Sequence, residues 1–253
     1  VTMAAGMAAS GLKPYVAIYS SFLQRAYDQL MIDVCAQNLP VTLLLDRGGL
    51  CGADGATHQG VFDLSYLRQM PGMVVAAPRD VRDLKRLMWL SLEHNGPMAI
   101  RYAKDAIDMG PGMQERGPLR VGEWELLAAG EDVMMLVVGR MVEVALQTSI
   151  ELHGKRIRCG VVDARFIKPM DEAMLREIAQ GSALLVTLED NALAGGFGSA
   201  VLEKLAEWGM RREVLTLGVP DRFIAHATVA EQMEELGLTP AAIAQKIIEK
   251  RGA

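Results

Sequence analysis

Short apolar runs that alternate with longer helical stretches are the feature that most constrains this fold. Val41-Thr-Leu-Leu-Leu45 and Val133-Met-Met-Leu-Val-Val138 place apolar side chains on both faces of an extended chain. Strands that are covered on both faces are typical of parallel sheets flanked by helices. The sequence therefore predicts an α/β protein built from doubly wound, mostly parallel sheets.

The same alternation continues along the whole chain. The expected strands are Val16–Tyr19, Val41–Asp46, Met73–Ala76, Met98–Tyr102, Val133–Val138, Arg158–Asp163, Leu184–Glu189 and Val214–Leu217. The expected helices are Phe22–Gln37, Asp63–Arg68, Asp80–His94, Val142–His153, Asp171–Gln180, Gly198–Trp208, Val229–Leu236 and Pro240–Lys250.

Between Ala103 and Gly130 the rhythm breaks, and glycine and proline occur without periodicity. Such segments are typical of loops and linkers. We therefore expect a first domain over residues 1–110, a linker over 111–130 and a second domain over 131–253. The length of 253 residues is sufficient for two domains of this size.

Composition excludes several classes of protein. The net charge is −5 and the 26 lysines and arginines are spread along the chain, which argues against a nucleic-acid partner. No apolar run is long enough to cross a membrane. Three cysteines that lie far apart fit a cytoplasmic protein and offer no metal-ligand spacing.

A long loop after the second expected strand is the strongest candidate for a functional site. Residues 47–60 contain five glycines together with Arg47, Asp54 and His58. A glycine-rich loop that also carries ionisable side chains more often forms a functional site than a simple connection between two elements. The alternative is that His58 caps the following helix or bonds a carbonyl group.

Other candidates lie at the ends of neighbouring strands, where ligands bind in open α/β sheets. Tyr19, Phe22 and Arg25 follow the first strand, and Arg101 ends the fourth. Arg47 and Arg101 at one sheet edge are suited to holding a phosphate or carboxylate. The alternatives are that Phe22 is core, Arg25 faces solvent, and Arg101 pairs with a local aspartate.

Longer motifs resemble the 1-deoxy-D-xylulose-5-phosphate synthase family. In the first half these are the segments Ala17–Gln29, Asp46–Gly49, Gly52–Gly60 and Phe62–Arg68. In the second half they are Val162–Asp171, Glu189–Ser199 and Gly218–Ile224. The resemblance covers essentially the whole chain. It implies a transketolase-like pyrimidine-binding domain followed by a transketolase C-terminal-like domain.

The resemblance also implies roles for the candidate residues. Phe22 would stack on the aminopyrimidine ring of thiamine diphosphate, with Arg25 in the adjoining polar cluster. Arg47 and Arg101 would hold the phosphate of D-glyceraldehyde 3-phosphate, assisted by Tyr19. Asp54 and His58 would line the substrate pocket and serve proton transfer. The family condenses pyruvate with this aldehyde by decarboxylation, feeding isoprenoid, thiamine and pyridoxal precursor synthesis.

The chain also departs from the family pattern. Val1 lies just after the position of the family's essential glutamate, and the N-terminal domain that binds Mg²⁺ and the diphosphate is missing. We therefore expect a fragment that is inactive alone. Ala103-Lys104-Asp105 replaces the usual Pro-Arg-Gly, and Lys104 could partly replace the arginine. A homodimer is expected from the family.

Three alternatives remain at this stage. The chain could be half of another thiamine enzyme, such as a transketolase or a 2-oxo-acid dehydrogenase β subunit. It could also be a non-catalytic scaffold for dimerisation. Finally, Gly195-Gly-Phe-Gly-Ser199 superficially resembles a dinucleotide-binding loop, but its spacing favours a tight loop that packs a helix on a sheet.

Overall fold

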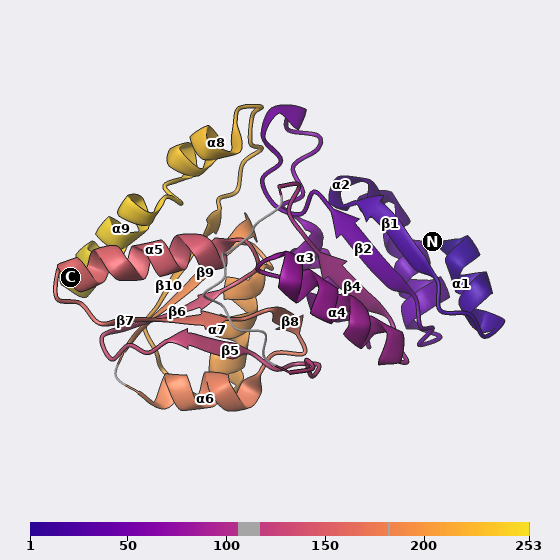
Figure 1. Cartoon of the computed structure of the whole chain (residues 1–253), viewed down its shortest axis with the longest axis horizontal. Helices are drawn as coiled ribbons and strands as arrows, with labels where there is room; N and C mark the ends of the chain where they lie inside the picture. The colour runs from indigo at the N-terminus through magenta and orange to yellow at the C-terminus, as the bar shows by residue number, and fades with distance from the viewer. Residues whose placement is uncertain (106–116, 182, 253) are drawn as a thin grey trace.

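Two α/β units lie side by side in the structure, a computed structural model, and each is built on a five-stranded sheet (Figure 1). The structure describes residues 1–105, 117–181 and 183–252. The strand orders are β1-β2-β4-β3-β8 and β10-β9-β6-β7-β5. Both sheets are mostly parallel, which confirms the predicted fold class.

The first unit contains four parallel strands from the N-terminal half of the chain. These strands are β1 (Tyr15–Tyr19), β2 (Thr42–Asp46), β3 (Val74–Ala76) and β4 (Met98–Arg101). The α-helices of this half are α1 (Thr2–Ala9), α2 (Ser20–Leu23), α3 (Asp63–Leu67) and α4 (Val81–Glu93). Shorter helical segments are η1 (Gln24–Ala26), the π-helix η2 (Gln29–Cys35) and η3 (Gly52–Asp54).

The second unit has helices on both faces of its sheet. Its strands are β5 (Glu125–Ala128), β6 (Val133–Val137), β7 (Cys159–Asp163), β9 (Leu184–Ala192) and β10 (Val214–Val219). Its helices are α5 (Met141–Gly154), α6 (Glu172–Gln180), α7 (Phe197–Glu207), α8 (Val229–Leu236) and α9 (Pro240–Gly252).

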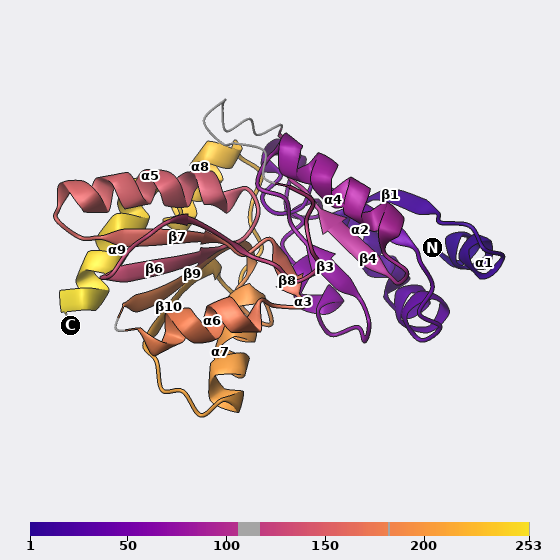
Figure 2. The same ribbon diagram turned by 60° about the horizontal axis from the view of Figure 1, so that its bottom comes forward.

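Successive side chains of β6 enter different cores, as the pleat of a strand requires. Val133, Met135 and Val137 share a cluster with α5 and α9. Met134 and Leu136 belong to the cluster that contains α6 and α7. Figure 2 shows these two helix pairs on opposite sides of the sheet. This two-sided burial is why the strand is apolar at every position.

The helix expected over Phe22–Gln37 is wrong as a single element, because the chain divides into α2, η1 and η2. The buried residues of η2 are Leu30, Val34 and Cys35. Val34 and Cys35 follow Leu30 by four and five residues, and the interval of five suits the wider turn of a π-helix better than an α-helix. The wider turn therefore keeps these side chains in the core.

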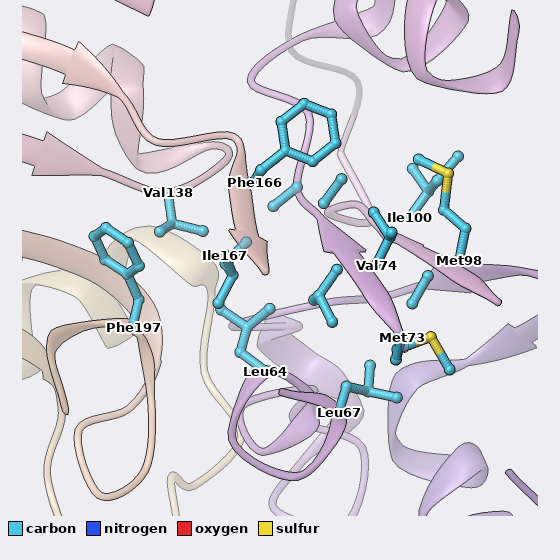
Figure 3. Packing of buried hydrophobic residues seen from close by; sticks show 14 of the residues in the cluster. Leu64, Leu67, Met73, Val74, Met98, Ile100, Val138, Phe166, Ile167 and Phe197 are labelled. Carbon is cyan, nitrogen blue, oxygen red and sulfur yellow. The ribbon is translucent and has the colours of Figure 1, made fainter. Parts of the chain in front are cut away.

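One strand crosses between the units and was not predicted. β8 (Phe166–Lys168) comes from the second half of the chain but pairs antiparallel with β3 of the first sheet. Phe166 and Ile167 pack into the same core as Leu64 and Val74 (Figure 3). The two halves therefore share one continuous hydrophobic core rather than meeting at a separable interface.

The region expected as a linker contains β5, which pairs with β7 at the edge of the second sheet. Residues 106–116, which include the first part of the expected linker, lie outside the described residues. The predicted domain boundaries stay a prediction.

A buried ion-pair network adds to the shared core. Arg79 of the first half and Arg165 of the second both contact the Oδ2 atom of Asp163, at 2.9 and 2.7 Å. Arg165 also lies 3.4 Å from Asp83 on α4. Burial and the neighbouring Asp163 raise the pKa of Asp83 to about 6, against the opposing effect of Arg165 and Arg79. The network thus ties α4 to the second unit.

Candidate active site

The carboxyl ends of β1, β2 and β4 bring the predicted site residues to one edge of the first sheet. Tyr19 ends β1, Arg101 ends β4, and the site loop of residues 47–60 follows β2. Gly49 and Gly60 close the base of this loop with two backbone hydrogen bonds of 2.7 and 2.8 Å. The loop is therefore held at its base and projects from the sheet edge where ligands bind in this architecture.

A row of stacked side chains runs along this edge. The Arg47 guanidinium lies 4.2 Å from the centroid of the Tyr19 ring. The Tyr19 ring stacks on Phe22 at 5.1 Å, and Phe22 meets the edge of His58 at 5.4 Å. Phe22 remains 49% exposed, so it is not the core residue of the alternative interpretation. An exposed aromatic ring of this kind can stack on a planar heterocycle.

Two cations converge on Asp54. Arg47 forms an ion pair with Asp54, and Lys104 Nζ lies 3.4 Å from the same carboxylate. The side chains of Arg47, Asp54 and Lys104 are 21%, 23% and 40% exposed. These cations are therefore held in place yet accessible to an anionic ligand.

His58 belongs to the same group. Its Nδ1 atom lies 2.9 Å from the Thr57 hydroxyl, and its ring contacts Phe22. Within the described part of the chain, no side chain caps α3, the helix that follows the site loop. The alternative that His58 caps this helix is therefore wrong.

Arg101 ends its strand as predicted but does not face an open pocket. The residue is 2% exposed, and its guanidinium contacts Asp190 at 2.6 Å and Asp63 at 3.3 Å. The alternative of an ion pair with an aspartate therefore describes its contacts. Its predicted role toward a phosphate is not supported by this geometry and stays a prediction.

The structure does not bring Arg25 into the group. Arg25 lies in η1 with an exposed side chain and, within the described part of the chain, has no ion pair or side-chain hydrogen bond. Solvent exposure is what the alternative interpretation predicts. A role beside the cofactor stays a prediction.

Comparison with known proteins identifies the family of the chain. The model of the transketolase pyrimidine binding domain matches residues 1–109, and that of the transketolase C-terminal domain matches residues 122–243. A 1-deoxy-D-xylulose-5-phosphate synthase of Synechococcus sp. (strain RCC307) is 48% identical over 100% of the chain. The 1-deoxy-D-xylulose-5-phosphate synthase 1 of Geobacter sulfurreducens is 49% identical over 96% of the chain.

The chain belongs to the 1-deoxy-D-xylulose-5-phosphate synthase family. It spans 40% of the length of the Synechococcus relative and 38% of that of the Geobacter relative, and corresponds to their C-terminal portion.

Solved structures show the same fold. A split-gene transketolase described as an inactive β4 tetramer superimposes with a TM-score of 0.87 and 28% identity. The match covers 98% of this chain and 79% of that one. A transketolase of Pichia stipitis superimposes with a TM-score of 0.77 at 19% identity, over 96% of this chain and 35% of its own.

In this family member, sequence reasoning missed the carboxylates that hold Arg101. Asp63 at the start of α3 and Asp190 on β9 are both fully buried. Burial raises the pKa of Asp63, and Arg101 partly opposes that rise. Burial would lower the pKa of Arg101, but Asp190 and Asp63 raise it more strongly. In the sequence both aspartates lie near glycine-rich motifs, but only the folded structure shows that they pair with Arg101.

The glycine-rich loop of the second half is closed by the protein itself. The Glu189 carboxylate accepts hydrogen bonds of 2.8 Å from the backbone N–H groups of Phe197 and Gly198, at the start of α7. A Cβ atom on Gly198 would lie 2.7 Å from Thr187 Oγ1. The interpretation as a tight packing loop is confirmed.

The described residues offer neither a metal-binding cluster nor a membrane-spanning helix. No group of three or more histidine, cysteine, aspartate or glutamate residues in that part of the chain could hold a metal ion. No helix there is long and apolar enough to span a membrane.

Proposed function

We propose that this chain forms the aldehyde-binding and pyrimidine-binding part of a 1-deoxy-D-xylulose-5-phosphate synthase. The reaction is the decarboxylative condensation of pyruvate with D-glyceraldehyde 3-phosphate, a thiamine-diphosphate-dependent transfer that feeds isoprenoid, thiamine and pyridoxal precursor synthesis. The supporting observation is the convergence of Arg47 and Lys104 on Asp54, beside the exposed ring of Phe22.

Phosphate binding falls to Arg47 and Lys104. Arg47 offers a planar set of N–H donors whose orientation is fixed by the Tyr19 ring beneath it. Its Nε atom is buried and has no hydrogen-bond partner among the residues that the structure describes. Lys104 adds a more exposed charge from the end of β4. Arg101, whose charge is neutralised by two buried carboxylates, supports the base of the site loop by donating to the Gly60 carbonyl at 3.3 Å.

The residues present fit the pyrimidine half of thiamine diphosphate. Phe22 presents an exposed ring for stacking, and Arg25 is proposed to lie in the polar cluster beside it. The cofactor, when bound, supplies the decarboxylation and carbon–carbon bond formation. This chain positions the reactants. Phe22 offers its ring to the pyrimidine of the cofactor, and Arg47 and Lys104 offer their charges to the phosphate of the aldehyde.

We assign proton transfer to His58. Asp54 and Tyr19 are assigned as hydrogen-bonding partners of the substrate. An imidazole can gain and lose a proton near neutral pH. Asp54 lies between the two cations, where its carboxylate can accept a hydrogen bond from a substrate hydroxyl.

The remaining parts are proposed to come from the portion of the family protein that precedes this chain. That portion would supply the essential glutamate and would bind the diphosphate and Mg²⁺. We further propose a cytoplasmic homodimer.

The test is an assay of the complete enzyme, meaning this chain together with that preceding portion. We expect 1-deoxy-D-xylulose 5-phosphate to form from pyruvate and D-glyceraldehyde 3-phosphate, and no product from the chain alone. Failure of a folded, cofactor-loaded complete enzyme to make this product contradicts the proposal.

A second candidate is one half of a transketolase. The split-gene transketolase chain superimposes over nearly the whole of this one, so chains of this extent occur as separate polypeptides. This candidate predicts transfer of a two-carbon unit from a ketose phosphate, with no consumption of pyruvate.

A 2-oxo-acid dehydrogenase β subunit would instead copurify with an α subunit. A dimerisation scaffold would leave thiamine diphosphate unbound even in the complete enzyme.

A further inference from the structure

We infer that Gln232, on α8 of the second half, is a positioning residue for the site loop and hence for Asp54. This inference rests on the proposed function, because Asp54 matters only if the site loop binds substrate. The second half of the chain therefore does more than build the fold: it sets where the acidic group of the site lies.

The contacts of Gln232 are specific. Its side chain is fully buried. Its Oε1 atom accepts a hydrogen bond of 3.1 Å from Gly52 N–H, and its Nε2 donates at 3.2 Å to the Gly52 carbonyl. The same Nε2 donates at 2.8 Å to the Ala225 carbonyl. One amide thus joins both backbone groups of a site-loop residue to the second half.

Gly52 is the first residue of η3, and Asp54 is the last. Gly52 has a φ of +70°, and a Cβ atom there would lie 3.2 Å from the Ala227 carbonyl and 3.4 Å from Val229 N. The turn therefore lies closely against the segment before α8. Figure 1 shows α8 beside the tip of this loop.

The tip of the loop is held at Asp54 by the ion pairs with Arg47 and Lys104, and at Gly52 by Gln232. The Gly49–Gly60 pair fixes only its base. Gln59 bonds Cys51 N–H and the Gly52 carbonyl, but Gln59 is itself part of the loop. Arg140 reaches the Leu50 carbonyl at 3.5 Å. Without Gln232, the two backbone groups of Gly52 lose their bonds to α8, so η3 can shift and change how Asp54 meets Arg47 and Lys104.

The test replaces Gln232 by methionine, which keeps the length of the side chain and removes its polar atoms. The control is Gln245→Met on α9, an exposed glutamine whose amide bonds Glu249. The first readout is hydrogen exchange in the ligand-free chain. We expect the amides of residues 52–58 to exchange about tenfold faster in Gln232→Met than in wild type or the control.

The second readout is kinetic and uses the complete enzyme. We expect the KM for D-glyceraldehyde 3-phosphate to rise about tenfold in Gln232→Met, while kcat and the KM for pyruvate change less than about twofold. A general loss of folded structure would lower the activity toward both substrates alike. The inference would be overturned if both the hydrogen exchange of residues 52–58 and the KM for D-glyceraldehyde 3-phosphate were unchanged. An equal loss of activity toward both substrates would also overturn it.

A second variant keeps the test decisive if Gln232→Met does not fold. Gly52→Ala strains the same contact from the loop side and leaves α8 intact, and we expect the same split in KM. If wild-type complete enzyme makes no product, the proposed function fails, whereas the exchange measurement still decides the role of Gln232.

Discussion

Replacing Arg101 by leucine distinguishes a structural arginine from a substrate-binding one. Arg101 donates to Asp190 at 2.6 Å and to Asp63 at 3.3 Å, and both aspartates are fully buried. Removing one partner of a buried ion pair leaves an uncompensated charge, which costs about 3–5 kcal/mol. We expect the free energy of unfolding to fall by this amount at pH 8.

The pH dependence of this loss has a defined sign. Burial already raises the pKa of Asp63, and Arg101 opposes the rise, so its removal raises that pKa further. An aspartate whose pKa is raised in the folded state favours folding most when protonated and loses that contribution as the pH rises. The cost of Arg101→Leu should therefore be smaller at pH 5 than at pH 8.

Urea unfolding followed by circular dichroism, at several pH values between 5 and 8, measures both effects. Arg158→Leu is the matched control for stability, because the Arg158 and Glu131 side chains are 59% and 71% exposed and such a pair should contribute only about 0–1 kcal/mol. A loss below about 1 kcal/mol for Arg101→Leu, together with weakened phosphate binding equal to that of Arg47→Leu, would refute the reasoning.

Four other substitutions give further tests. Burial raises the pKa of Glu189 to about 7, so its contribution to stability declines as the pH rises from about 4.5 to 7; Glu189→Gln should flatten that decline in urea titrations. Gly49→Ala should destabilise the chain by several kcal/mol, since φ is +86° and the new Cβ would overlap the Asp190 carboxylate. Gly6→Ala in α1, which meets no atom within 4 Å, should instead raise the melting temperature. Thr228→Ala removes the capping box of α8 and should cost about 1 kcal/mol by thermal unfolding; an unchanged Tm would contradict this.

The periodicity of the sequence was sufficient to locate the parallel strands. β6 is buried and apolar at all of its positions, so its pattern was unambiguous. β9 is buried throughout as well, and its apolar first half was recognised, whereas its end carries Glu189, Asp190 and Asn191. β5 and β8 escaped notice for the opposite reason. They are short, carry Glu125 and Lys168, and owe their extended form to pairing with β7 and β3. Such pairing is a tertiary effect that local sequence does not contain.

The candidate site was also predictable from the sequence only in part. Arg47, Asp54 and His58 were predicted together because they share one loop, and Tyr19 and Phe22 because they follow a neighbouring strand. Arg101 was expected to face a ligand because it ends an apolar strand. Its partners Asp63 and Asp190 lie 38 and 89 residues away, so only the fold could show that its charge is already neutralised.

The substrate preference of the complete enzyme tests the proposed role of this chain most directly. The measurement compares kcat/KM for D-glyceraldehyde 3-phosphate with that for unphosphorylated D-glyceraldehyde, in wild type and in Arg47→Leu. If Arg47 and Lys104 bind the phosphate, wild type should strongly prefer the phosphorylated aldehyde, and Arg47→Leu should lose about tenfold or more of that preference. An unchanged preference in the folded variant would contradict the assignment of the phosphate site to this sheet edge.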